Sequence, residues 1–259
     1  MDLSQYEPSG RYGGKARYYS RFRPSYPARA VEILRGEMGL SCRKVADIGA
    51  GTGVFSRQLL DAGLAVCAVE PNPDMRREAQ MALSGYPGFV CINGTAEATT
   101  LPTASVDALS CAQAFHWFDV ERVVPEFRRI LRPGGVVCLI WNNQCFGLDA
   151  FHQDYETVLR RGCPDYEKFD LASVSYGVDK LRAQFATDDV RRYHFDNAQA
   201  LDLNGLKGRI SSVSYCPPEG SDDYVQLMEQ VEALFRSHAH DDVVTIRYDV
   251  EMFCIRFAC

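Results

Sequence analysis

The stretch Asp47-Ile48-Gly49-Ala50-Gly51-Thr52-Gly53 decides the fold class of this chain. It follows a short apolar run, Val45-Ala46, and is succeeded by a helical pattern. A glycine-rich turn between a strand and a helix lets a nucleotide-like ligand approach bare backbone. Glu70 stands roughly 20 residues further on, at the end of a second apolar run, where an acidic side chain is placed to bind ribose hydroxyls. The pattern therefore predicts a nucleoside-binding site.

Apolar runs and helical patterns alternate along the chain from Lys44 onward. The predicted strands are 44–48, 64–70, 88–92, 105–111 and 135–141, and the predicted helices between them are 53–62, 73–84 and 119–132. An earlier helix opens at Pro27, whose fixed backbone angle suits a first helical turn. Strands joined by helices form a parallel sheet with right-handed crossovers, so the fold class is α/β.

The regular alternation ends after Asn142. A strand-like stretch at 191–195 and a helix over 224–240 follow, and the β-rich segment 243–257 is expected to form a hairpin or a bent edge strand. We predict a single domain over 1–259. Its parts are an N-terminal arm and first helix (1–40), a cofactor-binding core (41–142), substrate-side segments (143–190 and 205–240) and a C-terminal β segment (243–258).

The composition, 46% hydrophobic and 24% charged residues, is that of a soluble globular enzyme. A net charge of −6 argues against general nucleic-acid binding, which needs a basic surface. The polar amino terminus lacks a signal-peptide core, and no run approaches the roughly 18 apolar residues that span a bilayer. The ten cysteines form no Cys-x-x-Cys pair, which favours a reduced, cytoplasmic protein. We expect a monomer or homodimer that binds a small-molecule substrate, and neither nucleic acid nor membrane.

Three nucleoside chemistries compete for the glycine loop. A P-loop needs Gly-Lys-Ser/Thr, and no lysine follows here. A dinucleotide site needs glycine where Val54 stands, and its pyrophosphate would lie close to the like charge of Asp47. S-adenosylmethionine has no phosphate and carries an ammonium and a sulfonium, which an acidic strand end attracts. The residues favour this cofactor, whose product is S-adenosylhomocysteine.

The chain from about residue 16 to 142 resembles the class I S-adenosylmethionine-dependent methyltransferases, closest to the small-molecule branch (methyltransferase types 11 and 25). Asp47 to Gly53 matches that branch's Asp/Glu-x-Gly-x-Gly-x-Gly motif. The other matching segments are Glu70-Pro71-Asn72, Gly94-Thr95-Ala96-Glu97 with Leu101-Pro102, Val106-Asp107-Ala108, Ala114-Phe115-His116-Trp117-Phe118-Asp119 and Leu131-Arg132-Pro133-Gly134-Gly135. Segments 19–27 and 211–217 are similar to the subgroup of trans-aconitate methyltransferases.

The resemblance implies a Rossmann-like fold, with a seven-stranded, mostly parallel sheet whose last strand is antiparallel and helices on both faces. Asp47 is expected at the methionine ammonium, although a helix cap is the alternative, while Glu70 is expected at the ribose and Ala96 with Glu97 at the adenine. The predicted cofactor-binding residues are Asp47, Gly49, Ala50, Gly51, Thr52, Gly53, Glu70, Pro71, Ala96, Glu97, Gln113, Ala114, Tyr19 and Arg23.

Candidate substrate residues are Tyr26, His116, Trp117 and Tyr215. His116 is also the candidate catalytic residue, as a substrate contact or a base, and a packed aromatic corner is the alternative for His116 and Trp117. Tyr19, Arg23 and Tyr26 are expected to form a lid over the sulfonium or simply to pack on the sheet. No metal is predicted, because the His238–Asp242 stretch is typical of a helix end followed by an acidic turn.

The implied reaction is an in-line displacement in which the protein mainly positions the reacting atoms. A carboxylate or hydroxyl oxygen is the favoured acceptor, and nitrogen or carbon is possible. A carboxylate needs an arginine to bind it and no base, whereas a phenol, amine or carbon acceptor gives His116 or a tyrosine a larger role. Two other classes stay open, namely a catalytically inactive cofactor-binding protein that acts through partners and a NAD(P)-dependent oxidoreductase.

Overall fold

A seven-stranded sheet forms the centre of the computed structural model, which describes residues 14–39, 41, 43–167 and 176–258. The strands are β1 (Lys44–Ile48), β2 (Ala65–Val69), β3 (Phe89–Ile92), β4 (Val106–Ala112), β5 (Leu131–Gln144), β6 (Val190–Leu201) and β7 (Val244–Ile255). Their order is β3-β2-β1-β4-β5-β7-β6, and β7 runs antiparallel to both of its neighbours. The predicted mostly parallel sheet with an antiparallel last strand is confirmed.

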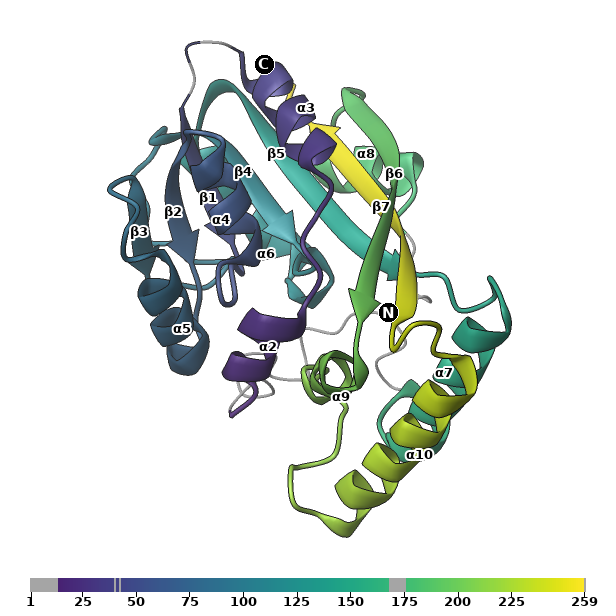
Figure 1. Cartoon of the computed structure of the whole chain (residues 1–259). Coiled ribbons are helices and arrows are strands. Elements are labelled where there is room, and N and C mark those ends of the chain that lie inside the picture. Colours follow the sequence, from purple (N-terminus) through teal and green to yellow (C-terminus); the bar gives the residue numbers. More distant parts are fainter. Residues whose placement is uncertain (1–13, 40, 42, 168–175, 259) are drawn as a thin grey trace.

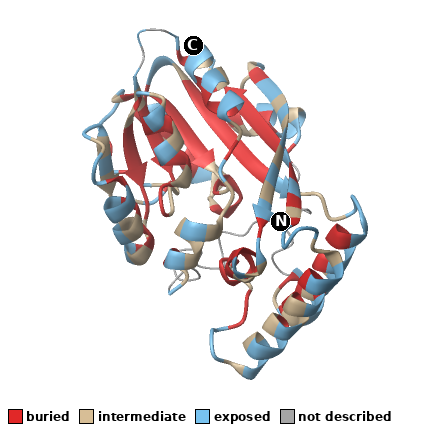
Figure 2. Ribbon diagram, in the orientation of Figure 1, coloured by how far each residue is buried: buried red, intermediate tan, exposed pale blue. Residues whose placement is uncertain are grey.

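Helices cover both faces of this sheet (Figure 1). They are α2 (Ala16–Phe22), α3 (Ala28–Met38), α4 (Val54–Asp61), α5 (Pro73–Leu83), α6 (Val120–Ile130), α7 (Ala150–Gly162), α8 (Val178–Phe185), α9 (Leu203–Ser211) and α10 (Asp222–His238), with a 3₁₀ turn at Phe115–Trp117. Buried apolar side chains on one face of the sheet pack with those of α3 and α4 in one hydrophobic cluster. Those on the other face pack with α6 and α8 in a second cluster. Figure 2 shows the buried strands between helices whose outer sides are exposed.

The carboxyl ends of the parallel strands point toward α2 and α9, while α7 and α10 pack side by side beyond them (Figure 1). Local capping fixes several of these helices. The side chain of Asn72 accepts hydrogen bonds from two backbone N–H groups at the start of α5, where Pro73 is the first helical residue. Within the described ranges, no helix has the length and apolar content needed to cross a membrane.

The C-terminal β segment departs from expectation. The prediction of a hairpin or a bent edge strand is wrong, because β7 is one continuous strand inserted between β5 and β6. The stretch expected at 191–195 is the middle of the longer β6, which pairs with β7 along its full length. The helix predicted over 119–132 ends at Ile130, because Leu131 has an extended backbone and begins β5. The segment 143–190 contains α7 and α8, and its residues 168–175 lie outside the described part.

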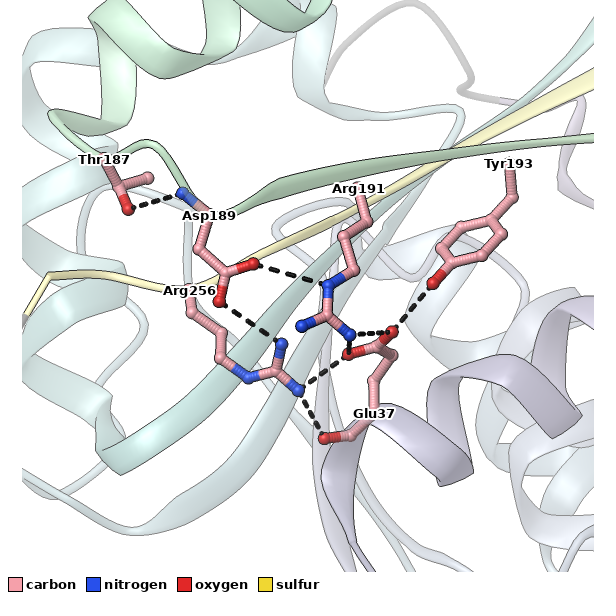
Figure 3. A network of polar contacts seen from close by, with 6 residues as sticks. All are labelled: Glu37, Thr187, Asp189, Arg191, Tyr193 and Arg256. Carbon is pink, nitrogen blue, oxygen red and sulfur yellow. Dashed lines mark hydrogen bonds and ion pairs between the residues drawn. The ribbon is translucent and has the colours of Figure 1, made fainter.

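An ion-pair network ties α3 to the far end of the sheet (Figure 3). The carboxylate of Glu37 accepts hydrogen bonds from Arg191 at 3.0 Å, Arg256 at 2.7 Å and the Tyr193 hydroxyl at 2.7 Å. Asp189 lies 3.5 Å from each of the two guanidinium groups. Partial burial alone would raise the pKa of Glu37, but the Tyr193 and Arg256 bonds and the arginine charges outweigh it and lower that pKa.

Candidate functional site

The glycine loop lies between β1 and α4 at the carboxyl edge of the sheet. Gly49, Gly51 and Gly53 all have positive φ angles, of 66°, 57° and 80°, which side chains with a Cβ rarely adopt. The Gly49 N–H donates a hydrogen bond to the Val69 carbonyl at 2.9 Å. Val69 is the last residue of β2, so this bond joins the loop to the strand end that precedes Glu70.

Glu70 is fixed at the mouth of the loop by two backbone donors. Its Oε2 accepts from Gly51 N at 2.8 Å, and its Oε1 accepts from Asn72 N at 2.9 Å. Only 7% of the residue is exposed, and burial raises its pKa, although both backbone bonds and the Arg76 charge oppose that shift. A carboxylate has about four acceptor positions, so Glu70 retains two for the hydroxyls of a ribose.

A cavity opens in front of Glu70 and the glycine loop. It is lined by Tyr19, Gly49, Gly51, Glu70, Pro71, Met75, Thr95, Ala96, Glu97, Ala112, Gln113, Ala114, Trp117, Phe118, Asp119 and Arg122. We call it the cofactor cavity. Nine of the predicted cofactor residues line it. Eight of them come from four segments at the carboxyl edge of the sheet, and the ninth is Tyr19 on α2. Sequence reasoning missed Met75 and Arg122, which enter from helices after the matched segments, although helical spacing from Pro71 and Asp119 signals both.

Other predicted cofactor residues lie outside this cavity. Thr52 and Gly53 belong to the loop but line neither this cavity nor the second one, whereas Ala50 and Arg23 line the second cavity. Gly53 provides a close approach, because a Cβ there would lie 2.7 Å from Leu83 Cδ1 on α5. Gly53 therefore supports the packing of the loop against α5 and presents no group to the cofactor cavity.

Asp47 is buried beneath the loop, with 1% of its surface exposed. Its two oxygens accept hydrogen bonds from Ser56 Oγ at 2.6 Å and Ser110 Oγ at 2.7 Å. Burial raises its pKa to about 6, and both serine bonds partly offset that effect. Asp47 lines neither cavity, so the geometry does not support the predicted direct contact with a methionine ammonium. Through these bonds Asp47 joins β1, α4 and β4.

The second cavity adjoins the first, and we call it the acceptor cavity. It is lined by Tyr19, Arg23, Pro24, Tyr26, Ala50, Val54, Phe55, Ala112, Gln113, His116, Trp117, Asn142, Asn143, Gln144, Phe146, Tyr166, Arg209, Val213, Ser214, Tyr215 and Tyr248. Tyr19, Ala112, Gln113 and Trp117 line both cavities. None of the described residues in this lining is acidic. All four predicted substrate residues line it.

Arg209 places a buried positive charge in the acceptor cavity. Only 4% of the residue is exposed, and its Nε donates to the Tyr248 hydroxyl at 3.3 Å. Its Nη1 is buried with no hydrogen-bond partner, and no acidic side chain of the described residues forms an ion pair with it. Sequence reasoning missed Arg209, since one basic residue in a helix carries no local signal of burial.

Arg23 adds a second positive charge to the same wall. Its Nη2 donates to the Ser212 carbonyl at 3.0 Å, and its guanidinium stacks 4.7 Å from the ring centroid of Tyr19. Its Nε is buried and has no hydrogen-bond partner among the residues that the structure describes. Arg23 therefore belongs to the acceptor cavity rather than to the predicted cofactor site, and Tyr19, which it contacts, separates the two cavities.

The N-terminal arm crosses the cleft between the sheet and α9. The Lys15 ammonium donates to the carbonyls of Val213 at 2.9 Å and Cys216 at 2.6 Å, and Gln199 donates to the Phe22 carbonyl at 2.9 Å. The α2 helix packs against both α5 and α9. The arm therefore contributes Tyr19 to both cavities and Arg23 to the acceptor cavity.

His116 lies in the 3₁₀ turn after β4 with 4% of its surface exposed. Its Nδ1 accepts a hydrogen bond from Trp141 Nε1 at 3.2 Å. Burial lowers its pKa to about 3, so the ring is neutral near pH 7 and a weak proton acceptor. The predicted role as a general base does not fit this environment, whereas the predicted substrate contact does.

The chain is similar to several known proteins. A family model described as a methyltransferase domain matches residues 46–139. An uncharacterized methyltransferase of Mycobacterium tuberculosis is 34% identical over 238 residues, which cover 92% of this chain and 90% of the relative. A candidate type II methyltransferase from Anaeromyxobacter dehalogenans has a TM-score of 0.59 at 23% identity, covering 91% of this chain and 98% of that one.

A second similar structure contains bound ligands. It is a phosphoethanolamine N-methyltransferase of Haemonchus contortus, solved with phosphomonomethylethanolamine and S-adenosylhomocysteine. Its TM-score is 0.53 at 15% identity, and the match covers 100% of this chain and 59% of that one. At such identities the two structural matches establish the fold alone.

Proposed function

Because the chain belongs to the class I S-adenosylmethionine-dependent methyltransferase family, we propose that it methylates an oxygen of a small anionic molecule, with a carboxylate as the acceptor group. The observation that carries this proposal is the buried guanidinium of Arg209. A buried charge without a counter-ion costs several kcal/mol, and an anionic ligand removes that penalty on binding. An anion is therefore the acceptor that this cavity fits best.

The cofactor cavity suits S-adenosylmethionine. Glu70 has free acceptor positions for two ribose hydroxyls, and Gly51 leaves open space, since only Tyr19 would lie within 4 Å of a Cβ there. When bound, the cofactor supplies a methyl carbon on a sulfonium that leaves readily as a thioether. Gln113 and Trp117 line both cavities and would lie beside the bound cofactor and the acceptor.

Charge balance explains why no base is needed. A carboxylate oxygen would bond to the methyl carbon as the carbon–sulfur bond breaks with its electron pair remaining on sulfur. An anion and a cation become a neutral ester and a neutral thioether, so no proton moves. Neutralising two charges is favoured beside side chains that are less polar than water, and aromatic rings make up much of the acceptor cavity's lining. The low pKa of His116 agrees with this mechanism.

The segment that resembles the trans-aconitate-methyltransferase subgroup takes part in the acceptor cavity. Val213, Ser214 and Tyr215, all within 211–217, line it beside Arg209. The same subgroup segment at 19–27 contributes Tyr19, Arg23 and Tyr26. These two segments support the assignment of the chain to that subgroup, which we propose with the carboxylate acceptor.

Methyl transfer from labelled S-adenosylmethionine to matched acceptors tests the function. Each carboxylate is compared with the corresponding primary alcohol and amine. We expect transfer to carboxylates, and Arg209→Met should raise the carboxylate KM by about 100-fold or more while the affinity for S-adenosylhomocysteine stays unchanged. Equal transfer by Arg209→Met and the unaltered protein would contradict the anionic acceptor. Tight NADH binding without S-adenosylhomocysteine binding would contradict the cofactor.

A further inference from the structure

The contact between Trp141 and His116 determines which ring nitrogen of His116 carries the proton. An indole N–H can only donate a hydrogen bond. Trp141 Nε1 lies 3.2 Å from His116 Nδ1, so Nδ1 must accept and cannot carry a hydrogen. In a neutral imidazole the proton then resides on Nε2.

The protonated Nε2 of His116 is buried, and none of the described residues offers it a hydrogen bond. His116 lines the acceptor cavity, whereas Trp141 does not, so the Nδ1 edge of the ring faces away from the cavity. An unpaired buried N–H is costly, and a ligand oxygen in the cavity would satisfy it.

Trp141 is itself rigidly placed. It lies on β5 with 5% of its surface exposed and stacks on Tyr176 at a centroid distance of 4.9 Å and an interplanar angle of 17°. Phe253 on β7 packs edge-on against it at 6.2 Å. The indole therefore has little freedom to turn its N–H away from His116.

We propose that Trp141 is a positioning residue that locks His116 in the Nε2–H tautomer, and that His116 donates this proton in a hydrogen bond to an oxygen of the methyl acceptor. The second part rests on the proposed function. The donor binds one carboxylate oxygen and leaves the other to attack. The His116 donor also selects against an ammonium acceptor, because an ammonium has only N–H donors and cannot accept its hydrogen bond.

The tautomer can be measured without any activity. In ¹⁵N-labelled protein, two-bond ¹H–¹⁵N spectra distinguish the two neutral tautomers, and His116→Gln identifies the His116 signals among those of the five histidines. We expect neutral Nε2–H in the unaltered protein and a substantial Nδ1–H population in Trp141→Phe, which keeps the aromatic packing but lacks the donor. A protonated Nδ1 in the unaltered protein would overturn the proposal, whatever the protein methylates.

Two substitutions at His116 test the donor itself. The Gln amide nitrogen reaches close to the position of Nε2 and is not basic, whereas Phe fills the space of the ring without a donor. We expect His116→Phe to lower kcat/KM by about 10- to 100-fold and His116→Gln to stay within about fivefold of the unaltered protein. S-adenosylhomocysteine affinity should be equal in both. His194→Gln, on the exposed side of β6, is the control and should change nothing. Equal losses in the Gln and Phe variants would show that the donor is not used.

Discussion

The carboxylate of Glu70 accepts a hydrogen bond from the backbone N–H of Gly51 at 2.8 Å. This bond joins the glycine loop after β1 to the acidic residue after β2. Both adjacent parallel strands end at the same edge of the sheet, which brings the loop and the acid together. Glu70 therefore both orders the loop and presents oxygen acceptors to a ligand, so its loss has two separable effects.

Replacing Glu70 tests its contact with the cofactor. Glu70→Ala should weaken S-adenosylhomocysteine binding by about 1–3 kcal/mol, because charge-assisted hydrogen bonds are lost. Calorimetry measures the dissociation constant. The control is Glu32→Ala, which removes an exposed carboxylate of α3 and should leave binding unchanged. An unaltered constant in Glu70→Ala would remove Glu70 from the site.

Asp47 makes the stability of the protein depend on pH. Its pKa in the fold, about 6, lies above the ordinary value of 3.8, so folding favours its protonated form. The stabilisation is complete below pH 3.8 and is lost as the pH rises through 6, a change of about 3 kcal/mol in order of magnitude. Asp47→Asn should lack this dependence. Urea unfolding at pH 4.5 and 7 measures this dependence. If the unaltered protein and Asp47→Asn lose the same free energy of unfolding between the two pH values, Asp47 is not the group responsible.

The Glu37 network should stabilise the fold without affecting the site. Glu37→Gln leaves Arg191 and Arg256 with a weaker acceptor, and we expect a loss of about 1–2 kcal/mol, since Arg191 is half exposed. Because the folded pKa of Glu37 is lowered, its contribution is present above the ordinary pKa and is lost as the pH falls through the folded value. Denaturant unfolding measures the loss, with Glu32→Gln on the same helix as control. Unchanged stability would show that the network contributes nothing.

Gly49 tests the close packing of the loop. A Cβ at this position would lie 2.8 Å from the Ala114 Cβ, and its φ of 66° is unfavourable for other residues. Gly49→Ala should displace the loop and weaken S-adenosylhomocysteine binding by about tenfold or more, as measured by calorimetry. Gly36 on α3 meets no atom within 4 Å, so Gly36→Ala should bind normally and melt slightly higher. Normal binding by Gly49→Ala would show that the loop tolerates a side chain.

The sequence by itself grouped most of the predicted residues that line the cofactor cavity. Its signals are local, since each of the segments at 47–53, 70–71, 96–97 and 113–114 directly follows a strand or lies in the loop after one. Parallel strands deliver all their carboxyl ends to one edge, so linear order was enough to group these residues. The same local patterns predicted β1 to β5 and the helices between them.

Only the tertiary structure decided the acceptor half. β7 enters between β5 and β6, a pairing between distant segments that periodicity does not specify. Arg209 is buried beside Tyr248 of β7, and it forms no ion pair with any described residue. His116 becomes a neutral donor because Trp141, on another strand, occupies its Nδ1. Burial and the choice of hydrogen-bond partner depend on which distant segments meet, and these two properties set the charge and proton position of each group.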